Sequence, residues 1–357
     1  MSSGDVARYV DAMLSRRTAL HGALAALSAG VAAPLLSATP RAARKPPRLR
    51  AGDIVGLVEP AGFSADAFEL SLAQETIMAM GLVPRTAPHV AARSGYLAGT
   101  DEERAADINA MYADDAVRAV FAVRGGWGCA RILPYLDFGL IRRNPKLLIG
   151  FSDITALHLA FAARAGFTTI HGPNAASSWG DLSWQAFRGL VFDGATPTYS
   201  NPAASEDRLV QRMWRTHVIR DGKATGPLVG GNLTVLSALV GTPYLPGFDG
   251  AILFLEDVDE AEYRIDRMLT QLALAGILRR VAGVVFGQCT SCRATGPSYG
   301  GFTLSEVLEH HFGPLGVPVF QGAMFGHIAN QFSLPVGAMA EIDAGAGTIR
   351  VLEAAVA

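Results

Sequence analysis

From residue 51 onward, short apolar runs alternate with stretches of helical periodicity. The strand candidates of the first half are 53–58, 82–86, 116–123, 146–149 and 167–170. Helical patterns lie between them, at 65–80, 100–111, 130–136 and 154–164. This alternation predicts a parallel sheet with helices on both faces. Such sheets carry their chemistry at the carboxyl ends of their strands.

The second half has a different pattern. Strand candidates at 251–255 and 281–286 alternate with helical patterns at 232–240, 260–275 and 304–312, and a hairpin is expected from 338–342 and 348–352. We therefore predict an α/β protein with an N-terminal flavodoxin-like domain at 51–195 and a C-terminal mixed α/β domain with antiparallel character at 227–357. The polar segment 196–226 is expected to be an irregular junction.

The N-terminal segment resembles an export signal. Arg16 and Arg17 precede a run of small and apolar residues at 19–38, which is typical of a twin-arginine signal over residues 1–38. A membrane anchor or an amphipathic tail is the alternative. Residues 39–50 are interpreted as a Pro-rich linker. We expect a periplasmic or otherwise exported protein, or a cytoplasmic one if the signal does not function; whether the signal is cleaved is left open.

Composition excludes several classes of protein. Half of the 357 residues are hydrophobic and 17% are charged, which excludes a disordered chain. The formal net charge is −2, and no basic tract lies beyond the N-terminal region, so nucleic acid is not an expected partner. No apolar run after residue 50 is long enough for a membrane span, so none is expected once the signal is removed.

The three cysteines do not predict a metal site. Cys289 and Cys292 have the spacing of a metal or redox pair, but no further ligands stand at suitable spacing. A disulfide is an option in an oxidising compartment. Two free thiols are the interpretation that the sequence favours.

Ser152 is the first candidate catalytic residue. It lies between a predicted strand and a predicted helix, in the sequence Gly-Phe-Ser-Asp. The free amides of the first helical turn can stabilise an oxyanion beside such a hydroxyl. Local sequence alone favours a simpler role, in which Ser152 caps the helix.

A glycine-rich segment follows another predicted strand. In Arg124-Gly-Gly-Trp-Gly128, the amide of Gly126 is a candidate oxyanion donor and Trp127 a candidate wall for the substrate. A phosphate loop is disfavoured because no Lys-Ser/Thr follows the glycines. A tight strand-to-helix turn is the structural alternative.

Two further residues complete the candidate set. Glu256 ends a buried strand and is suited to orient an imidazole, although it could instead pair with Arg264 while Asp257 or Asp259 caps the next helix. His327 follows Gly326 in an expected loop and could act as a general base or be an ordinary surface residue. We interpret His158, His310 and His311 as structural, and His171 is given no role.

Together, these segments resemble the LD-carboxypeptidase family of serine peptidases, which includes muramoyltetrapeptide carboxypeptidases and microcin C self-immunity proteins. The resemblance rests on 124–128, 150–157, 253–257, 263–269 and Gly326-His327, and covers residues 51–353. It implies a catalytic triad of Ser152, Glu256 and His327, with the amides of Gly126 and Asp153 as oxyanion donors. Trp127 stands where the family more often has tyrosine.

The resemblance also implies the reaction. The expected activity is hydrolysis of an L,D-peptide bond that releases terminal D-alanine from a murein tetrapeptide of the cell wall, with no metal or cofactor. One alternative is hydrolysis of a peptidyl-nucleotide or related amide in self-immunity. Another is a non-catalytic, exported solute-binding protein. The expected partner is a small peptide substrate, and a homodimer is left open as the assembly.

Overall fold

The structure is a computed structural model that describes residues 43–203, 209–211, 213–293 and 301–357. The expected signal at 1–38 and the first residues of the expected linker lie outside the described residues. In those ranges, no helix has both the length and the apolar character that crossing a bilayer requires.

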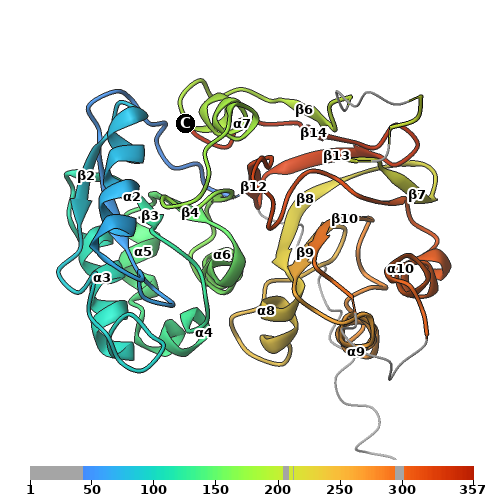
Figure 1. Cartoon of the computed structure of the whole chain (residues 1–357), viewed down its shortest axis with the longest axis horizontal. Helices are drawn as coiled ribbons and strands as arrows, with labels where there is room; N and C mark the ends of the chain where they lie inside the picture. Colours follow the sequence, from blue (N-terminus) through green and yellow to red (C-terminus); the bar gives the residue numbers. More distant parts are fainter. Residues whose placement is uncertain (1–42, 204–208, 212, 294–300) are drawn as a thin grey trace, which may run out of the picture. The chain divides into compact units, whose positions relative to one another are not determined.

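The first sheet has six strands in the order β12-β5-β4-β3-β1-β2 (Figure 1). Their bounds are β1 Ile54–Val58, β2 Val83–Thr86, β3 Val117–Ala122, β4 Leu147–Gly150, β5 Thr169–His171 and β12 Leu334–Val336. Strands β1 to β5 are parallel, and β12 pairs antiparallel with β5. The predicted parallel sheet is therefore confirmed, with an edge strand supplied by the far end of the chain.

Helices cover both faces of this sheet because the inner strands β1, β3 and β4 are apolar on both sides. Leu147 and Ile149 of β4 face one core cluster, and Leu148 faces the other. The helices of the first half are α2 Ala67–Ala79, α3 Asp101–Ala113, α4 Cys129–Ile132, α5 Phe138–Arg143, α6 Thr155–Arg164 and α7 Asp181–Val191. Buried residues of α2 and α7 join the first cluster, and those of α3, α5 and α6 join the second. A capping box formed by Thr100 and Glu103 begins α3.

The second sheet has eight strands in the order β6-β14-β13-β8-β9-β10-β11-β7. Their bounds are β6 Thr198–Ser200, β7 His217–Arg220, β8 Lys223–Asn232, β9 Ile252–Val258, β10 Gly283–Thr290, β11 Val319–Gln321, β13 Met339–Asp343 and β14 Thr348–Val351. Strands β8 to β11 are parallel, and the outer pairings are antiparallel. The expected mixed character and the final hairpin are confirmed.

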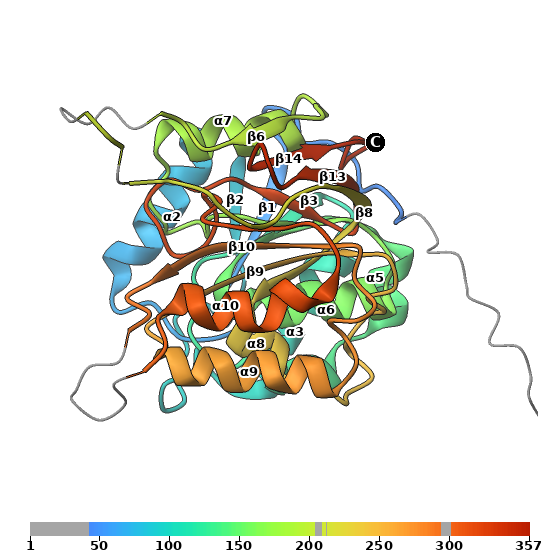
Figure 2. The ribbon, with the colours of Figure 1, turned by 90° about the vertical axis from the view of Figure 1, so that its right-hand side faces the viewer.

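Three helices pack beside the second sheet, namely α8 Leu233–Ala238, α9 Glu262–Leu274 and α10 Leu304–Phe312. Their buried residues belong to one core cluster with those of β9 and β10. Figure 2 shows α9 and α10 side by side, and His311 of α10 contacts Asp266 of α9 at 2.6 Å. This pair gives His311 the structural role expected from the sequence.

One expectation was wrong. The segment 196–226 is not wholly irregular, because it contains β6, β7 and the start of β8. The end of the chain also supplies a strand to the first sheet, in which Pro335 is buried in β12, opposite Ile170 of β5. A proline is tolerated there because an edge strand leaves one side of its backbone without a ladder partner.

The proposed division into 51–195, 196–226 and 227–357 stays a prediction. Both proposed domains contribute to the first sheet, since β12 of 227–357 pairs with β5 of 51–195. In the described part of the expected linker, Arg44 forms a β-bridge with Phe167 and Leu49 is buried. This stretch is therefore packed against the chain it precedes.

Candidate active site

Ser152 lies at the carboxyl end of β4, in a turn with an unusual backbone. Its φ is +65°, in the left-handed region that non-glycine residues rarely adopt, and Gly150 has a φ of +154°. The Ser152 side chain caps neither the 3₁₀ turn Ser152–Ile154 nor α6. The capping role that local sequence favoured is therefore wrong, and the hydroxyl is left free to face another partner.

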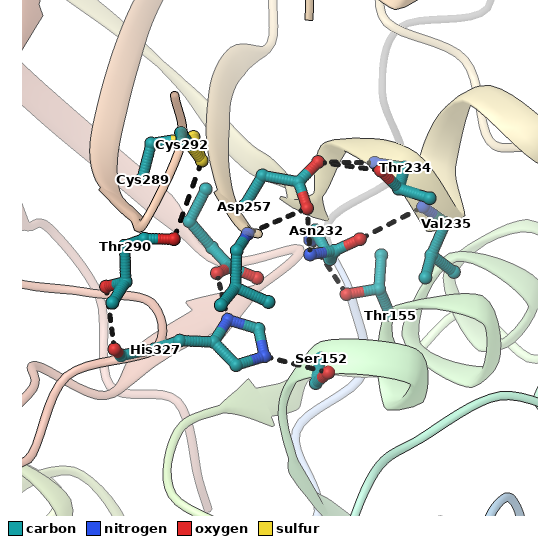
Figure 3. Close-up of polar contacts among 12 residues, drawn as sticks. Ser152, Thr155, Asn232, Thr234, Val235, Asp257, Cys289, Thr290, Cys292 and His327 are labelled. Atoms are coloured by element: carbon teal, nitrogen blue, oxygen red, sulfur yellow. Dashed lines mark hydrogen bonds and ion pairs between the residues drawn. A yellow bond between two sulfur atoms is a disulfide. The ribbon is translucent and has the colours of Figure 1, made fainter. Parts of the chain in front are cut away.

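That partner is His327. The Nε2 atom of His327 lies 2.9 Å from Ser152 Oγ (Figure 3). Its Nδ1 atom lies 2.8 Å from Glu256 Oε2. A carboxylate only accepts hydrogen bonds, so Nδ1 donates to Glu256. Nε2 is then the unprotonated nitrogen that accepts from the hydroxyl of Ser152. The structure thus brings the three predicted side chains together in one hydrogen-bonded chain.

Glu256 is fully buried near the carboxyl end of β9, and among the described residues only its Oε2 has a partner. The alternative pairing with Arg264 is absent, because Arg264 contacts Glu260 and the hydroxyl of Tyr263. Neither Asp257 nor Asp259 caps α9, whose N-cap is Ala261. Glu256 is therefore directed to the imidazole of His327.

Asp257 has a different role from its neighbour. Its carboxylate accepts hydrogen bonds from Asn232 Nδ2 at 3.0 Å and from the amide and hydroxyl of Thr234, each at 2.9 Å (Figure 3). The amide of Asn232 donates to Thr155 Oγ1 at 2.9 Å. Because Thr155 begins α6 just after Ser152, this network connects the serine turn to the strand that carries Glu256.

The electrostatics of the site follow from burial and these carboxylates. Burial alone would lower the pKa of His327, but the hydrogen bond and charge of Glu256, aided by Asp257 and Asp259, raise it above 6.5. Burial and the charge of Glu256 raise the pKa of Asp257 to about 6. The imidazole is consequently a stronger base than an ordinary histidine.

The expected oxyanion donors lie beside the serine. A Cβ on Gly125 would lie 3.0 Å from Ser152 Cβ and 3.5 Å from the amide nitrogen of Asp153, so a larger residue would crowd the serine. Gly126 lines the same pocket as Ser152. Within the described residues, the amides of Gly126 and Asp153 have no hydrogen-bond acceptor. The side chain of Asp153 is buried and accepts a hydrogen bond from the amide of Cys129 at 2.7 Å.

A pocket of about 290 Å³ opens over Ser152 and His327. It is lined by Glu69, Val123, Arg124, Gly125, Gly126, Phe151, Ser152, Asn174, Ala176, Ser177 and His327. Trp127, the expected wall, is not among these residues and is 43% exposed. Sequence reasoning singled out the glycines of this segment but assigned no role to Arg124, although its place beside them was the available signal.

Two buried histidines, His158 and His171, pack near the serine turn. His158 of α6 is fully buried, with Nε2 2.9 Å from the carbonyl of Gly150 and Nδ1 2.8 Å from Thr169 Oγ1. Burial lowers its pKa to about 4, so it is neutral at ordinary pH. His171 is also buried, and burial together with His158 and His327 lowers its pKa well below 6.5. The position of His158 agrees with the structural role expected for it, whereas no role was predicted for His171.

Cys289 and Cys292 form a disulfide, so the preference for two free thiols was wrong. Two thiols this close in space, with Cα atoms 5.4 Å apart, have the separation that a disulfide requires. Across the described ranges, no group of three or more His, Cys, Asp or Glu side chains is arranged to hold a metal ion.

The comparisons with known proteins agree with this geometry. Residues 55–172 match the LD-carboxypeptidase N-terminal domain family, and residues 225–342 match the LD-carboxypeptidase C-terminal domain family. The chain is 36% identical to the probable murein peptide carboxypeptidase of Bacillus subtilis, over 87% of this chain and 95% of that protein. It is 32% identical to the murein tetrapeptide carboxypeptidase of Pseudomonas aeruginosa, over 81% and 92%.

A solved structure has the same fold. MccF, a microcin C7 self-immunity protein solved in complex with glutamyl sulfamoyl guanosine, superposes with a TM-score of 0.79 at 24% identity, over 88% of this chain and 99% of that one. At 24% identity this similarity is evidence for the fold alone. The matches to the two domain families and to the murein peptidases identify the family. The chain belongs to the LD-carboxypeptidase family and is a serine-type peptidase.

Proposed function

We propose that the protein hydrolyses an L,D-peptide bond and releases terminal D-alanine from a murein tetrapeptide. The observation that supports this most directly is the position of His327, whose ring lies between the hydroxyl of Ser152 and the carboxylate of Glu256. The Bacillus and Pseudomonas relatives, a probable murein peptide carboxypeptidase and a murein tetrapeptide carboxypeptidase, suggest the substrate class.

In the proposed reaction, Ser152 Oγ attacks the carbonyl carbon of the scissile bond and its proton passes to His327 Nε2. The amides of Gly126 and Asp153 donate to the oxyanion. The C–N bond then breaks as His327 returns the proton to the leaving nitrogen, and D-alanine departs. Water attacks the acyl ester with His327 as base, which frees Ser152 and the shortened peptide.

Glu256 has a supporting role in this scheme. Its carboxylate holds the Nδ1 proton of His327, so that Nε2 presents its lone pair to Ser152 and the imidazolium is stabilised when it forms. Burial strengthens this effect, because Glu256 is fully enclosed and water does not compete for the bond.

The test is incubation of purified protein with murein tetrapeptide, followed by measurement of free D-alanine. Ser152→Ala should lower turnover by about 10³-fold or more, because loss of a triad nucleophile leaves only binding and oxyanion stabilisation. A matched control is Ser305→Ala, since Ser305 lies in α10 and its hydroxyl accepts a hydrogen bond from Gln321 at 2.9 Å, outside the pocket lining. D-alanine release that persists undiminished in Ser152→Ala would remove the proposed mechanism.

A second candidate is hydrolysis of a peptidyl-nucleotide or related amide. It is favoured by the fold shared with MccF, a self-immunity protein. Both candidates use the same three residues, so only the substrate separates them. Comparing kcat/KM for a murein tetrapeptide with that for an aminoacyl sulfamoyl nucleoside would decide, and a higher value for the nucleoside would replace the first candidate.

We also propose that the protein acts outside the cytoplasm, exported by the segment 1–38. The Cys289–Cys292 disulfide supports this location, because such bonds persist in oxidising compartments. Fusing residues 1–38 to a reporter that is active only after export tests it. Arg16→Lys with Arg17→Lys should retain the reporter in the cytoplasm, and export that survives both changes would contradict a twin-arginine route.

A further inference from the structure

The end of β10 holds the loop that carries His327. The amide of Gln288 donates to the carbonyl of Phe325 at 2.9 Å, and its side chain donates to the carbonyl of Gly322 at 2.7 Å. The next contact along the strand reaches His327 itself: Thr290 Oγ1 donates to the His327 carbonyl at 2.8 Å (Figure 3). Among these contacts, that of Thr290 is the one that fixes the backbone of His327.

Thr290 is also tied to the strand that carries Glu256. Its carbonyl accepts a hydrogen bond from the amide of Asp259 at 2.9 Å, and β10 pairs with β9 through Thr290 opposite Val258 and Cys289 opposite Asp257. A single residue therefore contacts the loop of His327 on one side and the segment that follows Glu256 on the other. The position of Thr290 therefore affects the distance between the imidazole of His327 and the carboxylate of Glu256.

The Cys289–Cys292 disulfide encloses Thr290 in a closed four-residue turn. The turn includes Ser291, whose φ of +58° is unfavourable for a residue other than glycine. Figure 3 shows Cys292 packed against Thr290, with its sulfur 3.7 Å from the Thr290 carbonyl. Because a strained turn persists only where its surroundings fix it, the covalent bond is what holds this conformation.

We infer that Thr290 is a positioning residue for His327 and that the Cys289–Cys292 disulfide keeps Thr290 in place. This inference rests on the proposed role of His327 as the base. A dithiol reductant breaks the S–S bond by thiolate attack and a second thiolate then closes the reductant's own disulfide, which leaves two thiols on the protein. Ser291 is exposed and both cysteines are partly exposed, so the bond is accessible to such a reductant.

The first arm of the test is substitution of Thr290. Thr290→Val keeps the shape and removes the hydroxyl, so kcat for D-alanine release should fall about 10- to 100-fold, since small misplacements of a base are costly, while KM changes little. Thr290→Ser restores the hydroxyl and should recover most of kcat. Thr242→Val is the matched control, because Thr242 makes the same kind of bond, to the Leu239 carbonyl at 2.8 Å, away from His327.

The second arm uses the wild-type chain and so does not depend on the folding of a variant. Treatment with dithiothreitol should lower kcat by a similar factor, and reoxidation should restore it. Cys289→Ser with Cys292→Ser should have the lower kcat and no response to the reductant. A kcat within about twofold of the untreated enzyme, in Thr290→Val or after complete reduction, would overturn the inference. Undiminished release by Ser152→Ala would instead remove the proposed function, so the two failures are distinguishable.

Discussion

Ser152 and His327 are 175 positions apart in the sequence, and their side chains meet at 2.9 Å. One comes from the end of a parallel strand in the first sheet, and the other from a loop held by the second sheet. The segment after His327 then returns to the first sheet as β12, beside the strand β5. The loop of His327 is thus anchored on both sheets, which restrains the approach of imidazole to hydroxyl.

Replacing Glu256 with Gln should lower kcat by about 10²- to 10⁴-fold. The amide can donate as well as accept, so it no longer selects the tautomer with the proton on Nδ1, and it cannot stabilise the imidazolium. The measurement is steady-state release of D-alanine. Glu341→Gln is the control, because Glu341 pairs with Arg350 on β14. Equal kcat in wild type and Glu256→Gln would contradict the role assigned to this carboxylate.

The pH dependence of kcat/KM should reflect the raised pKa of His327. The base acts when neutral, so activity is lost as pH falls through this pKa, and the midpoint of the acid limb should lie above 6.5. In Glu256→Gln, the hydrogen bond to an anion and its charge disappear, so the limb should move to lower pH. A limb that moves upward in this variant would contradict the assignment.

The sequence predicted correctly those features that depend on residues adjacent in the chain. The strand-end motifs placed Ser152, Asp153 and Glu256 correctly because each follows a short apolar run. Strand β8 was not predicted, since its sequence ends in Gly230, Gly231 and Asn232 rather than in an alternating pattern. Those glycines are required by neighbours from elsewhere: a Cβ on Gly231 would collide with Thr155 of α6. Such packing between segments distant in sequence leaves no local signal.

The same distinction explains the remaining differences in the site. The spacing of Cys289 and Cys292 permits a disulfide but does not show that Ser291 adopts a left-handed turn between them. Trp127 was expected over the substrate because of its glycine neighbours, yet it is not among the residues that line the pocket with Arg124. Side-chain direction after a glycine depends on backbone dihedrals that sequence does not specify. The catalytic roles themselves stay a prediction until the variants are measured.

Arg124 is expected to bind the terminal carboxylate of the substrate. It is the one Lys or Arg side chain among the residues that line the pocket, and its buried Nε has no acceptor in the described part of the chain. Its ion pair with Glu69 is long, at 3.6 Å, so the guanidinium can also bind a second anion. In Arg124→Gln, the preference for a free carboxylate over a C-terminal amide should fall about 10- to 100-fold.

The measurement for Arg124 is kcat/KM for a tetrapeptide and for its C-terminal amide. Arg93→Gln is the matched control, because Arg93 stacks on Phe63 and bonds the carbonyl of Ala65, whereas Arg124 bonds the carbonyl of Phe63. Both arginines therefore support the same loop, but only Arg124 lines the pocket. An unchanged ratio of the two substrates in Arg124→Gln would assign carboxylate recognition to another group.

The backbone of Ser152 predicts a conflict between stability and activity. A non-glycine residue at a φ of +65° costs about 1–2 kcal/mol, and the proposed reaction needs the hydroxyl at that point. Ser152→Gly and Ser152→Ala both abolish the nucleophile, but only glycine relieves the strain. The free energy of unfolding of Ser152→Gly should therefore exceed that of Ser152→Ala by about 1 kcal/mol. This difference allows for the greater flexibility of glycine in the unfolded chain. Chemical denaturation of both inactive variants measures this difference.

Gly166→Ala is the control for the cost of a Cβ in left-handed backbone away from the site. Gly166 has a φ of +74° in the turn after α6, and nothing lies within 4 Å of the added atom. Equal stability of the two Ser152 variants, alongside a destabilised Gly166→Ala, would mean that the serine turn stores no strain.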